Sequence, residues 1–345
     1  MRKIIMSVDC CKVGMRIAET VYNNFGVGIV LEGTILDQNI INKLKELGIE
    51  KVRVYPKSVD QIINYKAEVI KVQYREDVDA VKEVLHEISS GKALNAEKVK
   101  NITESIFEKI NDRWDIISCI NEMKEVDDYT YSHSVNVSLL CMMTAKWLGF
   151  NNVKMKLLVQ AGLLHDIGKA QVPADILNKA DKLTDIEFEE IKKHPVYGYK
   201  TAKKIPGIHE SVLKGILMHH EREDGSGYPI GIKGENIHEF AKIIAVADIY
   251  DAMTSPKIYR RKKTPFEVFE IMENHSFGVL DTRVRTVFIE NIANYYIGEK
   301  VKMNTGETGE IVFINSRHIS QPVVRIGNDY IDLSFKKNYK IVEMV

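Results

Sequence analysis

Seven histidine and aspartate residues in the central part of this 345-residue chain have the side-chain types and positions that metal binding requires. Each lies on or at the end of an apolar stretch of helical character, where an unpaired ionisable group would be costly to bury. One such histidine alone is better explained as a satisfied core residue, but five of the ten histidines of the chain belong to this set. Imidazole and carboxylate donors together suit iron, manganese or zinc, so the set predicts a metal site. Its members are His133, His165, Asp166, His194, His219, His220 and Asp248.

Two divalent ions held by such a set would suit the hydrolysis of a phosphoester. A pair of ions about 3.5–4 Å apart lowers the pKa of a shared water and neutralises phosphoryl oxygens as negative charge builds in the transition state. Lys169 follows Asp166 by three residues in "HDIGK" and would add a positive charge suited to a non-bridging phosphate oxygen. The alternative for Lys169 is a solvated lysine at a helix end.

A glycine-rich turn follows the paired histidines in "HHEREDGSGYP", residues 219–229. Asp224, Gly225 and Gly227 favour a tight turn, and Pro229 fixes its exit. Such a turn could simply end a helix. It could also let the backbone approach a ligand beside the metals.

The elements that must position these residues are mainly helices. Apolar residues recur with helical spacing over most of residues 126–297, and Thr184 with Asp185 is typical of a helix N-terminus. The expected helices include "HSVNVSLLCMMTAKWLG", "VKMKLLVQAGLLHDIG", "TDIEFEEIKKH", "ESVLKGILMHH", "EFAKIIAVADIYDAMTS" and "PFEVFEIMENHS".

The two ends of the chain differ from this helical segment. Residues 1–60 predict a small α+β module, with short strands and one helix that begins after Asp37 and ends at Gly48. Residues 298–345 are rich in Val, Ile and Gly with turn sequences, which is typical of a small antiparallel β module.

Residues 61–125 predict a helical connector of two charged helices. An apolar stripe within it could serve as a connector surface or as the seam of a homodimer, although no strict heptad persists. The stripe consists of Val81, Val84, Leu85 and Ile88.

The composition limits the classes of function. The 48 basic residues balance the 48 acidic residues, which argues against a general nucleic-acid polymer or membrane-surface binder. The N-terminus has no apolar signal core, and no run approaches the ~20 apolar residues of a membrane span. Four cysteines without a CxxC pair indicate a reducing compartment. We therefore expect a soluble, cytoplasmic protein.

Several motifs in order along the chain resemble the HD-GYP family of HD-superfamily phosphohydrolases. They are "HDIGK", "HP" at 194–195, "HHE", "DGSGYP" and "ADIYDAMTS", and the resemblance covers roughly residues 115–297. The family implies an all-helical domain that hydrolyses the bacterial second messenger cyclic di-GMP to the linear dinucleotide, and in some members on to GMP. The attacking group would be a hydroxide that bridges two metal ions.

The resemblance also assigns roles to individual residues. The seven histidines and aspartates would be the metal ligands, with iron or manganese the best match, and Asp166 would bridge the two ions as a catalytic residue. Lys169 would hold the scissile phosphate. The other expected substrate contacts are Gly227, Tyr228 and Pro229 at the lip of the pocket, together with Asp251, Lys257 and Arg260.

Two departures from the family pattern affect these expectations. The family often has "DRPYR" where this chain has "SPKIYR", so Lys257 would offer a point charge to phosphate instead of a bidentate fork. Members that hold a third ion use an acidic residue four positions before the first histidine ligand, and this chain has Tyr129 there. A neutral phenol is a poor ligand for a hard cation, and neither Asp127 nor Asp128 has the right helical spacing, so we expect two metals.

Two other functions remain open from the sequence. The substrate could be another cyclic dinucleotide, such as cyclic GMP-AMP. The protein could instead be a catalytically silent sensor of cyclic di-GMP, although the intact ligand set argues against this.

Overall fold

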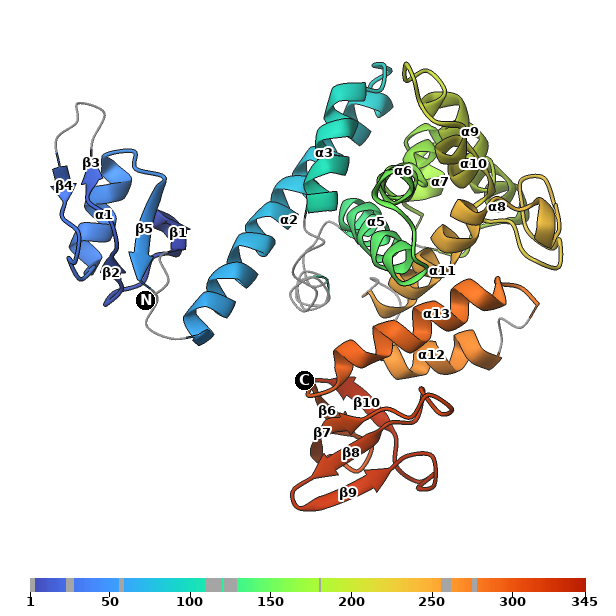
Figure 1. Ribbon diagram of the computed structural model, residues 1–345. Coiled ribbons are helices and arrows are strands. Elements are labelled where there is room, and N and C mark those ends of the chain that lie inside the picture. The colour runs from blue at the N-terminus through green and yellow to red at the C-terminus, as the bar shows by residue number, and fades with distance from the viewer. Residues whose placement is uncertain are drawn as a thin grey trace. The chain divides into compact units, whose positions relative to one another are not determined.

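The computed structural model describes residues 4–22, 28–55, 59–108, 120, 129–179, 181–255, 262–274 and 278–345 (Figure 1). The chain divides into two compact units, residues 1–73 and 74–345. The expected fold class is confirmed, because the described chain is mainly helical, with a small α+β module at one end and an antiparallel sheet at the other. The finer division into four segments stays a prediction.

The described part of the first unit contains a three-stranded antiparallel sheet, a short α-helix and the first part of a long helix that continues into the second unit. Strand β5 (Lys51–Tyr55) lies between β1 (Ile4–Ser7) and β2 (Arg16–Ile17). A separate hairpin pairs β3 (Val21–Tyr22) with β4 (Gly28–Val30).

Helix α1 (Gln38–Glu46) begins as the sequence predicts. The Asp37 carboxylate accepts a hydrogen bond of 2.7 Å from the backbone N–H of Ile40. Gly48, at φ +69°, ends this stretch in the left-handed conformation that favours glycine. The buried face of the helix joins the core of the unit through Ile41 and Leu44.

Helix α2 (Val59–Ser89) is longer than the sequence pattern indicates and is followed by α3 (Ala96–Glu108). Of its apolar stripe, Val81 and Val84 are buried within the single chain, together with Val99 and Ile102 of α3. The stripe therefore packs at least in part inside the chain, as a connector surface would, and the alternative of a homodimer seam stays a prediction.

Four helices form the centre of the second unit. Helix α5 (Tyr129–Trp147) contacts α6 (Asn152–Leu164) and α11 (Glu239–Thr254), and α10 (Glu210–Met218) contacts the same two helices (Figure 1). Gly162 permits the close approach of α6 to α5, because a Cβ atom there would lie 3.1 Å from Cα of Ser138.

Further elements surround this four-helix centre. Thr184 caps the N-terminus of helix α8, as the sequence predicts, and it exchanges hydrogen bonds with Glu187 in both directions. The surrounding elements are η3 (Ile167–Gln171), α7 (Ala174–Leu177), α8 (Asp185–Ile191), α9 (His194–Ala202), η4 (Gly234–Asn236), α12 (Pro265–Asn274), α13 (Thr282–Ala293) and η5 (Asn294–Tyr296).

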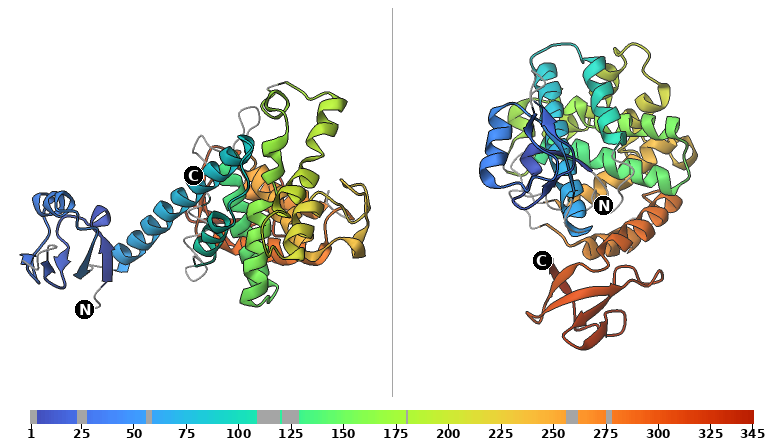
Figure 2. Two further views of the ribbon diagram at one scale, coloured as in Figure 1. Left: turned by 90° about the horizontal axis from the view of Figure 1, so that it is seen from above. Right: turned by 60° about the vertical axis from the view of Figure 1, so that its left-hand side comes forward.

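The C-terminal module is a five-stranded antiparallel sheet beside α12 and α13 (Figure 1, Figure 2). Ser320 ties it to α12 by a 3.2 Å hydrogen bond to Glu273. The strand order of the sheet is β10 (Ile341–Met344), β6 (Lys300–Met303), β7 (Thr308–Phe313), β8 (Val323–Ile326) and β9 (Asp329–Asp332).

In the described part of the chain, no helix has both the length and the apolar character needed to cross a membrane.

Candidate metal centre

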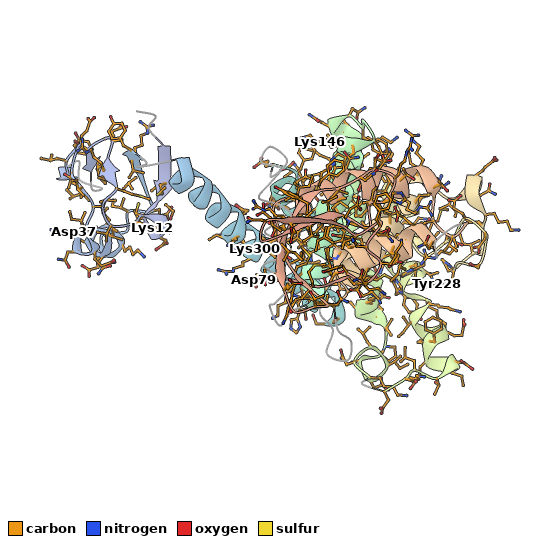
Figure 3. All side chains as sticks on the ribbon, turned by 90° about the horizontal axis from the view of Figure 1, so that it is seen from below. Lys12, Asp37, Asp79, Lys146, Tyr228 and Lys300 are labelled. Atoms are coloured by element: carbon orange, nitrogen blue, oxygen red, sulfur yellow. The ribbon has the colours of Figure 1, made fainter. Side chains whose placement is uncertain are left out.

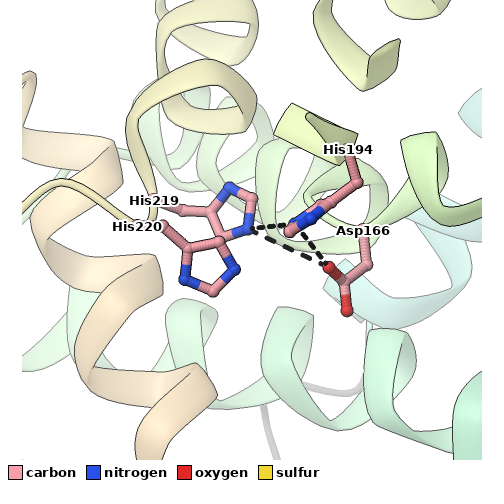
Figure 4. Close-up of side chains that lie close together, drawn as sticks. All are labelled: Asp166, His194, His219 and His220. Atoms are coloured by element: carbon pink, nitrogen blue, oxygen red, sulfur yellow. Dashed lines mark hydrogen bonds and ion pairs between the residues drawn. The ribbon is translucent and has the colours of Figure 1, made fainter. Parts of the chain in front are cut away.

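The seven histidines and aspartates singled out in the sequence come together in the second unit. They are carried by α5, the end of α6, the start of α9, the end of α10, and α11. Their donor atoms form two clusters, and within each cluster all of these atoms lie within 4.8 Å of one another. One cluster is Asp166, His194, His219 and His220 (Figure 4), and the other is His133, His165 and Asp248.

Asp166 lies between the two clusters. Its Oδ2 atom is 3.3 Å from Nε2 of His165 and 3.6 Å from Nε2 of His133. Its Oδ1 atom is 3.2 Å from Nε2 of His194 and 3.9 Å from Nε2 of His219 (Figure 4). One carboxylate thus presents an oxygen to each cluster, which is the geometry that a bridging ligand requires.

Hydrogen bonds to backbone carbonyls fix the orientation of three of the histidine rings. Nδ1 of each ring lies 2.7 Å from the carbonyl oxygen three residues earlier in the chain. A carbonyl oxygen can only accept, so Nδ1 carries a proton, and in the neutral ring Nε2 then has the lone pair. The three residues are His165, His194 and His219.

His133 is oriented by a carboxylate. Its Nδ1 atom lies 2.8 Å from Oδ2 of Asp251, and its Nε2 atom lies 3.1 Å from Oδ1 of Asp248. The second oxygen of Asp251 accepts a 3.0 Å hydrogen bond from the side-chain amide of Asn136. Asp251 is fully buried, so the expected direct contact with substrate is not supported there. We assign Asp251 the role of holding the His133 ring.

The pKa values of the aspartates keep them ionised. Burial alone would raise the pKa of Asp166, but the charge of Lys169 and the hydrogen-bonding contacts with His165 and His194 hold it well below its usual range. Burial opposes ionisation of Asp248 in the same way, and its hydrogen bond and charge interaction with His133 lower its pKa.

The histidines divide into two kinds. Burial lowers the pKa of His219 well below its usual value and lowers that of His220 to about 3, so both rings are neutral and can donate lone pairs. Burial would also lower the pKa of His133, but hydrogen bonds to Asp248 and Asp251 outweigh burial and raise it to about 9.

The donor set fits divalent metal ions. Nε2 of His165 and Oδ1 of Asp166 are buried and have no hydrogen-bond partner among the described residues. Leaving buried polar atoms unpaired costs about 1–3 kcal/mol each, and a bound cation would remove that cost. Histidine nitrogens with oriented lone pairs and ionised carboxylates are the donors that such ions prefer.

Gly168 brings His194 to the centre. A Cβ atom at Gly168 would lie 2.0 Å from the carbonyl oxygen of His194 and 2.4 Å from the backbone N of Gly198. Any side chain at this position would push α9 away from η3. The glycine of "HDIGK" therefore sets the distance between Asp166 and His194.

Lys169 lies at the edge of the centre, where sequence spacing placed it. Its ammonium group is 2.5 Å from Oδ2 of Asp166, and its side chain is 31% exposed. Burial would lower its pKa, but the charge of Asp166 raises it, so the group stays cationic. A partly exposed cation beside a buried carboxylate can contact an anionic ligand.

The Glu221 side chain anchors the loop that follows His220. This buried carboxylate accepts hydrogen bonds of 2.7–3.2 Å from the backbone N–H groups of Ile230, Gly231 and Ile232. A charged acceptor bonded to three successive backbone donors is a strong anchor.

This anchored loop places Tyr228 against the metal centre. The Tyr228 ring stacks on His220, with ring centroids 4.7 Å apart. Figure 3 labels Tyr228 among the side chains of the second unit. Gly227 is needed for the fold of the loop itself, because a Cβ atom there would lie 2.4 Å from Cα of Glu221. The sequence suggested that the backbone at Gly227 could approach a ligand. In the structure the backbone at Gly227 lies against the backbone of residues 220–222 of the same loop. Pro229 follows Tyr228 in the same partly exposed stretch.

Some expected residues fall outside the part of the chain that the structure describes. Lys257, Arg260, Asp127 and Asp128 belong to these residues. Tyr129 is the first residue of α5, but its side chain is not described. The expected substrate contacts of Lys257 and Arg260 stay predictions, as does the effect of Tyr129 on the number of ions.

Comparisons with known proteins agree with this geometry. A family model described as HD domain matches residues 117–284. A cyclic di-GMP phosphodiesterase of Pseudomonas aeruginosa is 32% identical over 247 residues, which are 72% of this chain and 59% of that protein. A 3'3'-cGAMP-specific phosphodiesterase of Vibrio cholerae is 38% identical over 177 residues, which are 51% of this chain and 41% of that protein. The chain thus matches less than two thirds of the length of these relatives.

A solved structure has the same fold. The HDG"Y"P protein from Bdellovibrio bacteriovorus gives a TM-score of 0.53 at 17% sequence identity, and the match covers 84% of this chain and 99% of that chain. At this identity the likeness concerns the fold alone.

Proposed function

The chain belongs to the HD-GYP family of HD-domain proteins, and from that membership we propose that it hydrolyses a phosphodiester bond of cyclic di-GMP to give the linear dinucleotide. The observation that carries this proposal is the position of Asp166, whose two oxygens face two separate donor clusters. Two metal ions that share one carboxylate are an arrangement used for phosphoester hydrolysis.

Each cluster would hold one divalent ion, with iron or manganese as the expected metal. Asp166 would contribute to both ions. Bound ions would supply positive charge to the phosphoryl oxygens and would activate water at neutral pH. The neutral rings of His219 and His220 offer lone pairs to one ion, and His133, His165 and Asp248 offer donors to the other.

The remaining residues of the site would bind and orient the phosphodiester. The ammonium group of Lys169, which lies 2.5 Å from Oδ2 of Asp166 at the edge of the clusters, would contact a non-bridging phosphate oxygen. Tyr228, held by the Glu221 anchor and stacked on His220, would border the space above the metals. Lys257 and Arg260 would add positive charge toward the nucleotide, as the sequence predicts.

A second substrate is favoured by one comparison. The relative from Vibrio cholerae is named a 3'3'-cGAMP-specific phosphodiesterase, and it is 38% identical over the matched region. Cyclic GMP-AMP has the same phosphodiester ring, so the metal centre alone does not discriminate between the two substrates.

The test is hydrolysis by protein purified without oxygen, with each cyclic dinucleotide offered separately and together. We expect the linear dinucleotide from cyclic di-GMP, with a larger kcat/KM than for cyclic GMP-AMP. The reverse ratio would establish the second substrate. Tight binding of cyclic di-GMP without any product, in protein that carries its full complement of metal, would establish the silent sensor and overturn the proposal.

A further inference from the structure

We propose that Tyr74 of helix α2 is a positioning residue for the metal centre, acting on His133 through Asn136 and Asp251. Tyr74 precedes the residues matched by the HD-domain family, which begin at 117. The inference rests on the metal centre of the proposed function but not on the identity of its substrate.

An unbroken row of hydrogen bonds joins Tyr74 to the metal centre. The Tyr74 hydroxyl donates to Oδ1 of Asn136 over 2.7 Å. The Asn136 amide donates to Oδ1 of Asp251 over 3.0 Å, and Oδ2 of Asp251 lies 2.8 Å from Nδ1 of His133. On its other side, the His133 ring presents Nε2 to the cluster.

The residues that form these hydrogen bonds are buried, so the loss of one hydrogen bond should affect the others. Tyr74 and Asn136 are each 1% exposed, and Asp251 is 0% exposed. Water has little access to a group there that loses its partner, so the loss of one hydrogen bond is costly. Oδ1 of Asp251 also accepts a 3.3 Å hydrogen bond from Ser255, which would keep part of its satisfaction when the Asn136 contact is weakened. The Tyr74 hydroxyl also favours one orientation of the Asn136 amide, because it occupies the carbonyl side and leaves the NH₂ group toward Asp251.

Helix α2 is anchored on the elements that carry the ligands. Val81 and Val84 of α2 border the same small apolar space as Leu164 at the end of α6 and Ile167 of η3, on either side of the His165–Asp166 pair. The Lys82 ammonium group lies 5.3 Å from the ring centre of Tyr131 in α5. The packing therefore fixes the position from which the Tyr74 hydroxyl reaches Asn136.

This arrangement makes α2 part of the metal site. A residue that orients a ligand through a hydrogen bond usually contributes about 10–100-fold to metal affinity. Asp251 is in that position. Tyr74 is separated from Asp251 by two further hydrogen bonds. We therefore expect it to contribute less to metal affinity, about 3–10-fold.

The test is metal binding by the full chain carrying Tyr74→Phe, which removes only the hydroxyl. Metal-stripped protein is titrated with Mn²⁺, and free Mn²⁺ is followed by electron paramagnetic resonance. The matched control is Tyr296→Phe, which removes another buried hydroxyl, one that is 2.5 Å from the Tyr250 hydroxyl. We expect Tyr74→Phe to weaken one of the two Mn²⁺ sites about 3–10-fold and the control to leave both sites unchanged.

A second measurement separates positioning from general destabilisation. In an Asp251→Asn background the row is already altered next to His133, so Tyr74→Phe should cause little further loss of Mn²⁺ affinity. Equal Mn²⁺ affinities for Tyr74→Phe and Tyr296→Phe, or fully additive losses in the double variant, would overturn the proposal. Wild-type protein that binds two Mn²⁺ ions without hydrolysing any cyclic dinucleotide would overturn the proposed function and leave this inference standing.

Discussion

Oδ1 of Asp166 lies 3.2 Å from Nε2 of His194, while the other oxygen of the same carboxylate faces His165 and His133. His194 begins α9, and Asp166 follows the end of α6. Their approach depends on Gly168, which lets η3 pack directly against the start of α9. The Asp166 carboxylate thus joins the two groups of donor atoms into one centre.

Replacement of both His165 and Asp166 by alanine should abolish hydrolysis and remove most of the bound metal. The change deletes the donor shared by the two clusters together with one further donor. Metal content by elemental analysis and product formation by chromatography check the result. Normal turnover by the double variant would place the reaction elsewhere in the chain.

Lys169→Ala should retain the metal and lose turnover. The lysine is assigned to phosphate charge, and loss of one charge-assisted contact in a closed site costs about 10²–10³-fold in rate. Metal content and kcat are measured on the same preparation. If metal and activity fall in equal proportion, the contact between Lys169 and Asp166 serves metal binding instead.

Glu221→Gln should weaken substrate binding more than catalysis. The neutral amide loses the charge that anchors three backbone N–H groups, and one of its ends cannot accept hydrogen bonds. We expect KM to rise several-fold with a smaller change in kcat and full metal content. Glu235→Gln, at an exposed position of nearby η4, is the matched control. A pure loss of kcat would show that the loop acts on the reacting atoms.

Metal binding should release a proton from His133. In metal-free protein the pKa of His133 is raised from 6.5 to about 9, so the ring is protonated at neutral pH, yet a metal needs its neutral form. The proton stabilises the metal-free fold fully below pH about 6.5, and this contribution is lost as pH rises through about 9. Metal affinity should therefore increase with pH up to about 9.

Calorimetric titrations in buffers of different ionisation enthalpy measure this proton. Asp251→Asn removes one of the two carboxylates that raise the pKa of His133, so fewer protons should be released at pH 8 than from the unmodified protein. Proton release that is the same in both proteins would show that His133 is not the group that titrates.

The sequence singled out the candidate ligands because helical spacing and residue type are local properties. His133, His165 and Asp248 could be selected from their positions at helix faces and ends, and the Thr184 cap could be read directly. The family resemblance assigned Asp251 to the substrate. Its burial and its contact with His133 were not visible in the sequence, because they depend on tertiary packing and the two residues are 118 positions apart.

Other positioning residues were missed for the same reason. Glu221 stands in the quoted "HHE" motif, but only the folded loop shows that it accepts three backbone hydrogen bonds. Asn136 lies three residues after His133, a helical spacing that could have indicated it. Tyr74 carried no local indication, because its contact with Asn136 spans 62 residues.

The most direct test of the two-metal centre is stepwise reconstitution of metal-stripped protein under anaerobic conditions. Cyclic di-GMP hydrolysis is measured after each addition of Mn²⁺ or Fe²⁺. Asp166 faces both clusters, and the family resemblance places Tyr129 where a third ion would need an acidic residue. Activity should therefore rise with the second equivalent and saturate at two ions per chain. Full activity at one equivalent, or a further rise that saturates only at three, would contradict this account.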